Sequence, residues 1–129
     1  MEIDSRHTLV PLGIDADSPG HGQQDLRGRR VFDRAGEEIG NVRDLLLDGN
    51  GGQIRLLIVV ADHTVDTILR QFALPVDAIS RLEPDRLFVD LLRERVMSAP
   101  LYDPETPPPP DYWDGLFAYY GIAPYWTPA

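Results

Sequence analysis

The sequence predicts an all-β fold: a small β-barrel of about six strands with one short C-terminal helix. Two observations support this prediction. Short runs rich in leucine and β-branched residues alternate with turns that contain glycine or proline. Strands this short, joined by tight turns, favour a closed barrel or a strongly curled sheet, which leaves few exposed edges. The composition divides the chain into an N-terminal arm (1–24), the barrel domain (25–103) and a proline-rich and aromatic tail (104–129).

Two consecutive hairpins are predicted in the first half of the domain. The runs 30–33 and 39–47 flank a turn in which Gly36 can take the positive φ of a tight hairpin. The segment 48–52 reads Asp-Gly-Asn-Gly-Gly, and Asp-Gly and Asn-Gly pairs favour turns between twisted strands. The strand predicted at 53–60 should therefore pair with the strand that precedes it.

The next part of the domain is less regular. Residues 65–69 fit either a helical turn or the start of a strand. Residues 72–76 are predicted to form a strand, and Pro75 places that strand at an edge or a bulge, because proline has no N–H for the ladder.

The domain is predicted to end with a third hairpin and a helix. Its two strands are 79–82 and 87–91, and the turn between them contains Pro84. Residues 91–99 have helical spacing, and Pro100 ends that helix.

Composition limits the function classes. A hydrophobic content of 43% in 129 residues is enough for one core. The formal net charge of -9 repels phosphate backbones, so nucleic-acid binding is not expected. The chain has no cysteine, which excludes disulfides and thiolate chemistry. No apolar run is long enough to span a bilayer and no secretory signal is recognised, so we expect a cytoplasmic protein without a membrane span.

Several segments of the domain occur in a characteristic order, namely Asp25-Leu26-Arg27-Gly28 with Val31, Asp33 to Gly36, Ile39-Gly40-Asn41-Val42, Asp44 to Asp48, Ile54 to Val60, Leu74-Pro75-Val76 and Ala99 to Asp103. This ordered series resembles the PRC-barrel family, which includes the cytoplasmic domain of the photosynthetic reaction-centre H subunit. The entering Leu9-Val10-Pro11-Leu12 is similar to the arm of small stand-alone members. The resemblance covers about residues 8 to 105. It implies a β-barrel used for assembly and protein contact, with no shared catalytic residues.

No catalytic, metal or cofactor site is predicted. His7, His21 and His63 lie in separate arm or turn segments without carboxylates at ligand spacing. The segment 48–52 resembles half of a calcium loop, but Gln53 stands where that loop needs glycine, so a hairpin turn is the better interpretation. No serine lies in a nucleophile motif, and we expect no enzymatic activity.

The tail holds seven aromatic residues within the last eighteen positions, behind a polyproline spacer at 107–110. These candidate partner-binding residues are Tyr112, Trp113, Phe117, Tyr119, Tyr120, Tyr125 and Trp126. Aromatic side chains bury large areas, so the tail should dock. Docking on a partner and docking on its own barrel as a strap are both open.

The sequence therefore predicts a non-enzymatic protein-interaction or assembly module. The partner is a protein, and a second copy of the chain in a homodimer is one candidate. The alternative is a small-ligand-binding protein, in which Trp113, Tyr119, Tyr120 and Trp126 line a pocket against the barrel mouth.

Overall fold

The computed structural model describes residues 9–13, 20, 22–48, 52–61, 70–103, 105–106 and 108–125. The strands in these residues are β1 (Leu9–Pro11), β2 (Arg30–Phe32), β3 (Glu38–Asp48), β4 (Ile54–Ala61), β5 (Gln71–Pro75), β6 (Ile79–Leu82) and β7 (Arg86–Val89). The helices are the short 3-10 turn η2 (Val76–Ala78), α1 (Arg93–Met97) and α2 (Pro110–Tyr120). The fold is thus mainly β, as predicted.

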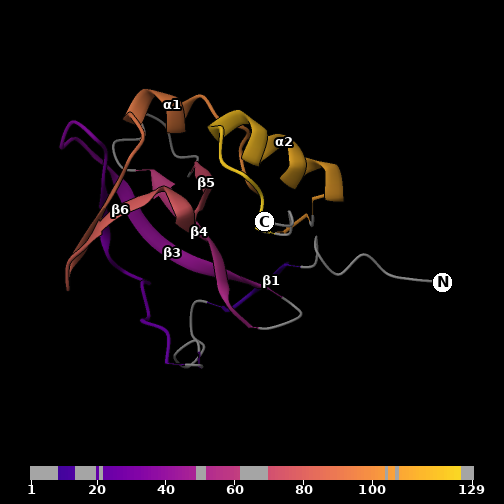
Figure 1. Ribbon diagram of the computed structural model, residues 1–129, viewed down its shortest axis with the longest axis horizontal. Coiled ribbons are helices and arrows are strands. Elements are labelled where there is room, and N and C mark those ends of the chain that lie inside the picture. Colours follow the sequence, from indigo (N-terminus) through magenta and orange to yellow (C-terminus); the bar gives the residue numbers. More distant parts are fainter. Residues whose placement is uncertain are drawn as a thin grey trace.

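The strands form one sheet in the order β5-β4-β3-β2-β7-β6, and β1 pairs separately with the far end of β3. All pairings are antiparallel except that of β2 with β7, which is parallel. The sheet curls into a half-barrel, and both helices lie along one side of it (Figure 1).

The curl depends on a close approach between β3 and β4 at Gly40. A Cβ atom at this position would lie 1.8 Å from the carbonyl oxygen of Val60, so only glycine fits. The register between the two strands also shifts twice along β3. Such bulges bend a strand and increase its twist, which turns a flat ladder into a half-barrel.

The N-terminal arm joins the sheet as a strand. Leu9 pairs with Asp48 and Pro11 with Leu46. Arg27 binds the segment that follows β1, because its Nη1 donates to the carbonyl oxygen of Gly13 at 2.6 Å. The described part of the predicted N-terminal arm therefore includes a strand, β1, which pairs with β3.

The core runs through β4. Four consecutive residues, Leu56 to Val59, are at most 2% exposed. Because neighbouring side chains on a strand point to opposite faces, the sheet is covered on both faces here. The same apolar cluster includes four side chains of α2, namely Trp113, Leu116, Phe117 and Tyr120.

The three predicted hairpins are confirmed: β2 pairs with β3, β3 with β4, and β6 with β7. Pro75 is the last residue of β5, and β5 is an edge strand, as its proline predicted. The ambiguous segment 65–69 lies outside the described residues.

The structure contains one helix more than the sequence predicted. Residues 93–97 do form a helix inside the predicted range, but the tail forms a second and longer one, α2. The tail was predicted only as extended proline followed by aromatic residues. No helix among the described residues has the length and apolar character needed to cross a bilayer.

Candidate functional site

The tail helix has clear start and stop signals. Pro109 is extended, with φ -66° and ψ 158°, and Pro110 occupies the first helical position, where its missing N–H costs nothing. Gly121 ends the helix with φ 70°, a left-handed conformation. Its N–H donates to the carbonyl of Ala118, and that of Ile122 donates to Phe117, which is a Schellman motif.

The inner face of α2 packs on the barrel of its own chain. Trp113 is 4% exposed and lies against Tyr102, with ring centroids 6.1 Å apart. Phe117 is 1% exposed. The Tyr112 hydroxyl donates to the carbonyl oxygen of Leu101 at 3.2 Å. The geometry of these residues fits the strap interpretation of the tail.

Two other aromatic residues of the tail, Tyr119 and Tyr125, are half-buried, and an arginine guanidinium group lies over the ring of each. The Arg95 guanidinium lies 4.4 Å from the ring centroid of Tyr119, and the Tyr119 hydroxyl donates to the carbonyl oxygen of Arg95 at 2.7 Å. The Arg55 guanidinium lies 4.5 Å from the ring centroid of Tyr125. Trp126 lies outside the described residues. Partner binding by the seven tail aromatics stays a prediction.

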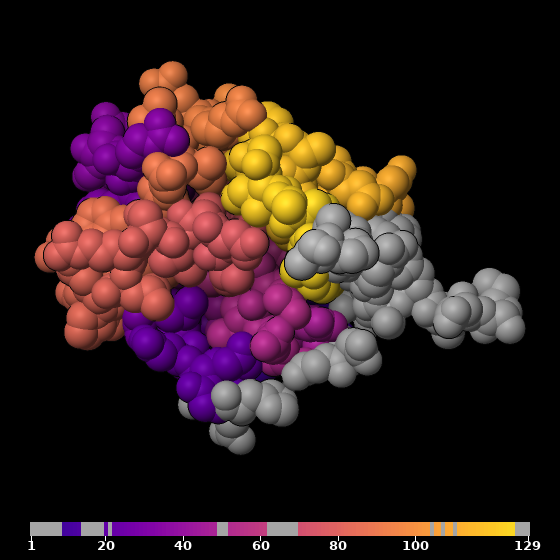
Figure 2. Space-filling view, viewed as in Figure 1, coloured from indigo at the N-terminus to yellow at the C-terminus, as the bar shows by residue number. Residues whose placement is uncertain are grey.

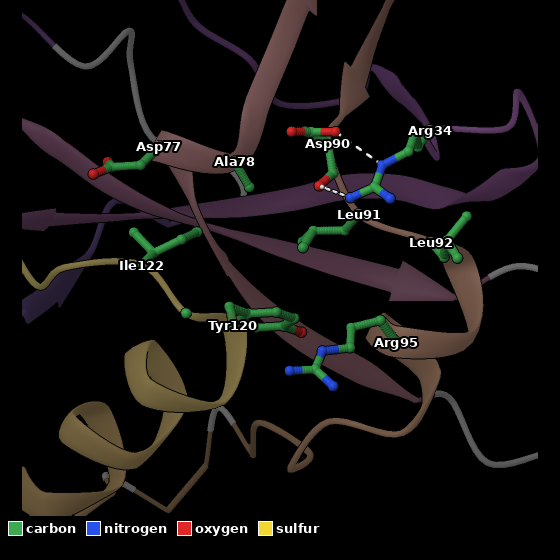
Figure 3. A pocket seen from close by; sticks show the side chains of 10 residues that line it. Arg34, Asp77, Ala78, Asp90, Leu91, Leu92, Arg95, Tyr120 and Ile122 are labelled. Carbon is green, nitrogen blue, oxygen red and sulfur yellow. Dashed lines mark hydrogen bonds and ion pairs between the residues drawn. The ribbon is translucent and has the colours of Figure 1, made fainter.

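A cleft of about 480 Å³ opens where the tail meets the barrel. Its lining comes from five separate segments: Arg34, Asp77, Ala78, Asp90, Leu91, Leu92, Arg95, Tyr120, Gly121 and Ile122. Figure 3 shows Asp77 at one end and Arg95 toward the other, with Leu91, Tyr120 and Ile122 between them. Figure 2 shows the yellow tail directly against the orange segment that carries α1.

The predicted ligand pocket beside the tail thus corresponds to a real concavity, but its lining differs from the prediction. Three of the four aromatic residues assigned to it are described, and of these Tyr120 alone lines this cleft, while Trp126 lies outside the described residues. Trp113 is in the core, and Tyr119 lies outside the lining. Burial raises the pKa of Tyr120, so its hydroxyl stays protonated at neutral pH and is available as a hydrogen-bond donor.

The outer face of β2, β6 and β7 carries a second candidate site. Phe32 and Phe88 stack with ring centroids 5.4 Å apart. The Arg30 guanidinium lies 5.1 Å from the Phe32 ring, and those of Arg81 and Arg86 lie 5.5 Å and 5.8 Å from the rings of Phe88 and Phe32. We call these five residues the arginine–phenylalanine face.

Strand register explains this face. Arg30 pairs with Arg86 and Phe32 with Phe88 across the parallel β2–β7 ladder, while the residues between them are buried. Both strands carry the pattern Arg-x-Phe, at 30–32 and 86–88. That repeat was a readable sequence signal, but sequence reasoning missed it because nothing local indicated that the two strands lie side by side.

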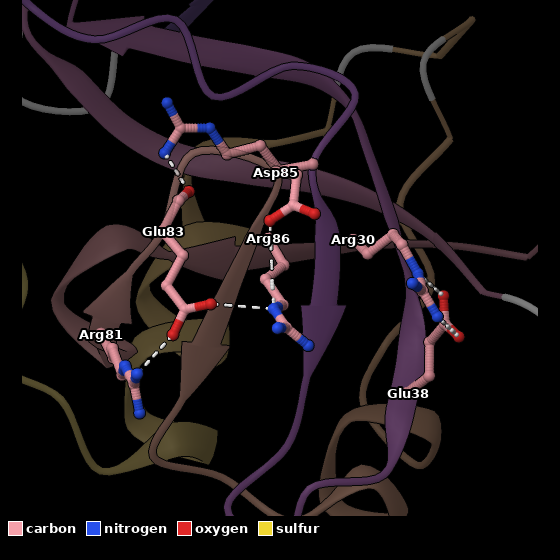
Figure 4. A network of polar contacts seen from close by, with 7 residues as sticks. Arg30, Glu38, Arg81, Glu83, Asp85 and Arg86 are labelled. Carbon is pink, nitrogen blue, oxygen red and sulfur yellow. Dashed lines mark hydrogen bonds and ion pairs between the residues drawn. The ribbon is translucent and has the colours of Figure 1, made fainter.

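Ion pairs hold the arginines of this face in place (Figure 4). Arg30 pairs with Glu38 through two hydrogen bonds of 2.9 Å and 3.0 Å. Glu83 contacts both Arg81 and Arg86, at 2.5 Å and 2.8 Å. These ion pairs restrict the three guanidinium groups, which lie within 6 Å of the phenylalanine ring centroids.

Two carboxylates with lowered pKa values have structural roles. Asp25 forms a two-point pair with Arg27, and these hydrogen bonds hold the pKa of Asp25 below its usual range. Burial of Asp33 would raise its pKa, but the backbone N–H groups of Arg93, Glu37 and their neighbours outweigh burial and lower it. A shifted pKa indicates a functional site only when structural hydrogen bonds or ion pairs of the carboxylate do not already explain the shift.

The described residues contain no group of three or more histidine, aspartate or glutamate side chains that could hold a metal ion. His7, His21 and His63 lie outside those residues, as do Gly49, Asn50 and Gly51 of the predicted turn. At the ends of that turn, the Gly52 N–H donates to the carbonyl oxygen of Asp48, and the Asp48 carboxylate pairs with Arg55 at 3.3 Å.

Comparison with known families matches residues 20–96 to the PRC-barrel domain. This match covers more than half of the chain and includes every strand from β2 to β7. No curated protein matches the chain. The tail and its helix α2 lie beyond the matched residues.

Proposed function

We propose that this chain, which belongs to the PRC-barrel domain family, is a non-enzymatic protein-binding module that docks its partner on the arginine–phenylalanine face. The observation that carries the proposal is the stack of Phe32 on Phe88 beneath three exposed arginines. Arginine and aromatic residues are enriched where proteins bind one another, and they dominate the binding energy there.

The face is preorganised for binding. Its residues stand on paired strands, and their side chains are fixed by stacking and by the ion pairs with Glu38 and Glu83. Little side-chain freedom is then lost when a partner docks, which raises affinity for a given contact area.

Charge indicates the chemistry of the partner. The whole chain has a formal net charge of -9, whereas the charges on this face balance, with Arg30, Arg81 and Arg86 against Glu38, Glu83 and Asp85. A partner surface with carboxylates around an apolar centre complements the arginines and the phenylalanines together. A second copy of the chain would add its own -9 to the encounter, so we assign the face to a different protein.

The proposal assigns no reaction to the chain. Asp25 and Asp33, the described carboxylates with lowered pKa values, are committed to Arg27 and to backbone N–H groups. A general acid or base needs a side chain that can reach the substrate and whose pKa lies near the working pH.

The test is affinity capture from the native cell with the full chain and two matched charge reversals. Arg81→Glu changes the face, while Arg70→Glu changes an exposed arginine next to β5, at the opposite edge of the sheet. We expect a partner that is captured by the wild type and by Arg70→Glu and is lost with Arg81→Glu. Equal capture by all three proteins contradicts the proposal.

Light scattering of the purified chain provides the second measurement. A monomer is expected for the wild type and for both variants. A wild-type dimer that Arg81→Glu dissociates would identify a second copy as the occupant of the face, and would overturn the assignment to a different protein.

A further inference from the structure

The cleft beside the tail contains a buried polar group that the fold leaves unused. Tyr120 is 7% exposed, and its hydroxyl has no hydrogen-bond partner among the residues that the structure describes. A buried hydroxyl without a partner destabilises the fold relative to a satisfied one. Such an orphan donor next to a cleft indicates that an acceptor outside the described chain completes it.

A cation lies beside this donor. Arg95 is exposed, and its described contacts are with the ring and the backbone carbonyl of Tyr119. Within the described residues Arg95 forms no ion pair, whereas Arg34, the other arginine of the cleft, is paired with Asp90 at 2.9 Å. Figure 3 shows the Tyr120 hydroxyl on the side of its ring that faces Arg95.

The remaining lining defines the rest of the ligand. Ala78, Leu91 and Ile122 offer apolar surface between the two ends of the cleft. Asp77 carries a negative charge at the end away from Arg95, which repels an anion from that end (Figure 3). The volume of about 480 Å³ suits a small organic molecule.

We propose that this cleft binds a small organic carboxylate with an apolar body, whose carboxylate accepts hydrogen bonds from Arg95 and the Tyr120 hydroxyl. A carboxylate only accepts hydrogen bonds, so it satisfies a cation and a neutral donor at once. The apolar body lies along Leu91 and Ile122, and the Asp77 end stays free of the anion. The hydroxyl is covered in this structure, so ligand entry requires a local rearrangement of the side chains around it.

This site is separate from the protein-binding face. It lies at the junction of α1, α2 and η2, whereas the arginine–phenylalanine face is on β2, β6 and β7. The failure of either proposal therefore leaves the other intact.

The experiment is a titration of the full isotope-labelled chain with 3-phenylpropionate, followed by amide chemical shifts in NMR spectra. We expect saturable shifts at residues 90–92, 95 and 120–122, with a dissociation constant on the order of millimolar. The neutral analogue 3-phenylpropanol, which lacks the carboxylate, should bind at least about tenfold more weakly.

Three variants make the test specific. Tyr120→Phe removes only the hydroxyl and should weaken 3-phenylpropionate binding about fivefold or more, while leaving the fold at least as stable. Arg95→Gln should weaken binding about tenfold or more. Arg43→Gln, in a second cleft of about 300 Å³ near β1, should leave binding unchanged.

Each of several outcomes would overturn the proposal. They are shifts that do not saturate, equal binding of the acid and the alcohol, or shifts centred on Arg43 and Tyr102 in the second cleft. Arg95 also contacts Tyr119, so Arg95→Gln can loosen the tail. If its melting temperature falls, Tyr120→Phe alone decides the question, and unchanged affinity in that variant rejects the site.

Discussion

Replacing Asp33 should destabilise the fold far more than its position next to a surface turn suggests. Its side chain is 2% exposed. One carboxylate oxygen, Oδ1, accepts the N–H groups of Ala35 and Glu37 at 2.8 Å each, and Oδ2 accepts the N–H of Arg93, also at 2.8 Å. This single carboxylate therefore joins the β2–β3 turn to the first turn of α1.

The magnitude follows from those three bonds. A hydrogen bond to a charged group contributes about 1.5–3 kcal/mol, and water recovers part of this where the donor lies in an exposed turn. Ala35 and Glu37 are exposed, so water can replace the carboxylate there, whereas Arg93 is partly buried. We expect Asp33→Ala to lower the free energy of unfolding by about 3–5 kcal/mol. Asp33→Asn keeps one oxygen but turns an NH₂ toward Arg93, and should cost about 1.5–3 kcal/mol.

The effect should depend on pH in a defined direction. Although burial opposes it, backbone hydrogen bonding lowers the pKa of Asp33 below the ordinary value of 3.8. The stabilisation by the charged form is then fully present above pH 3.8 and is lost as the pH falls through the lower pKa of the folded state. The difference between wild type and Asp33→Asn should therefore shrink in acid.

Urea unfolding monitored by tryptophan fluorescence measures both effects, since the buried Trp113 reports on the core. Asp90→Asn is the matched control, because Asp90 also pairs with an arginine but its side chain is 69% exposed. That control should cost less than about 1 kcal/mol. The reasoning is refuted if Asp33→Asn costs no more than Asp90→Asn, or if its cost is the same at neutral and acidic pH.

Three further predictions test other parts of the fold. Gly40→Ala should lower the free energy of unfolding by at least about 3 kcal/mol, because the new methyl group meets a backbone carbonyl that cannot move without breaking the ladder. Its control, Gly115→Ala, lies in exposed helix with nothing within 4 Å and should stabilise by about 0.5–1 kcal/mol; similar results for the two in thermal denaturation would reject the close approach. A chain that ends at Asp103 loses α2 and should lose cooperative unfolding and its near-ultraviolet circular dichroism, whereas a stable, native-like truncated chain would show that α2 is dispensable cover. Burial raises the pKa of Tyr112 to about 12, so stability should fall as the pH rises from 10.0 toward 12; an alkaline absorbance titration should lose one late-ionising group in Tyr112→Phe, and an unchanged titration would contradict this.

The strands and hairpins were predictable because their signals are local. Gly36 takes φ 87° in the first turn, which a glycine does at little cost, and alternating side chains identify the buried face of each strand. Pro75 marked an edge strand for an equally local reason, its missing N–H. Such signals depend on a few neighbouring residues, so they can be interpreted without knowing how the rest of the chain packs.

The helix in the tail and the surface that it covers were not predicted from the sequence. The prolines before α2 suggested an extended spacer, but Pro110 is the first residue of a helix whose apolar side recurs at Trp113, Phe117 and Tyr120. That spacing is typical of a helix, but the run of prolines before it favours an extended chain. Which surface the helix would cover was not readable, because its contacts on the barrel lie in distant segments.

The sequence alone determined the strands and turns of the three hairpins and of β5, because periodicity and turn chemistry are properties of neighbouring residues. Only the tertiary structure decided that β2 lies parallel to β7, which brings two Arg-x-Phe patterns onto one face. It also decided that Arg95 and Tyr120 share a cleft. Both arrangements depend on packing between residues far apart in the chain, and no local pattern encodes that packing.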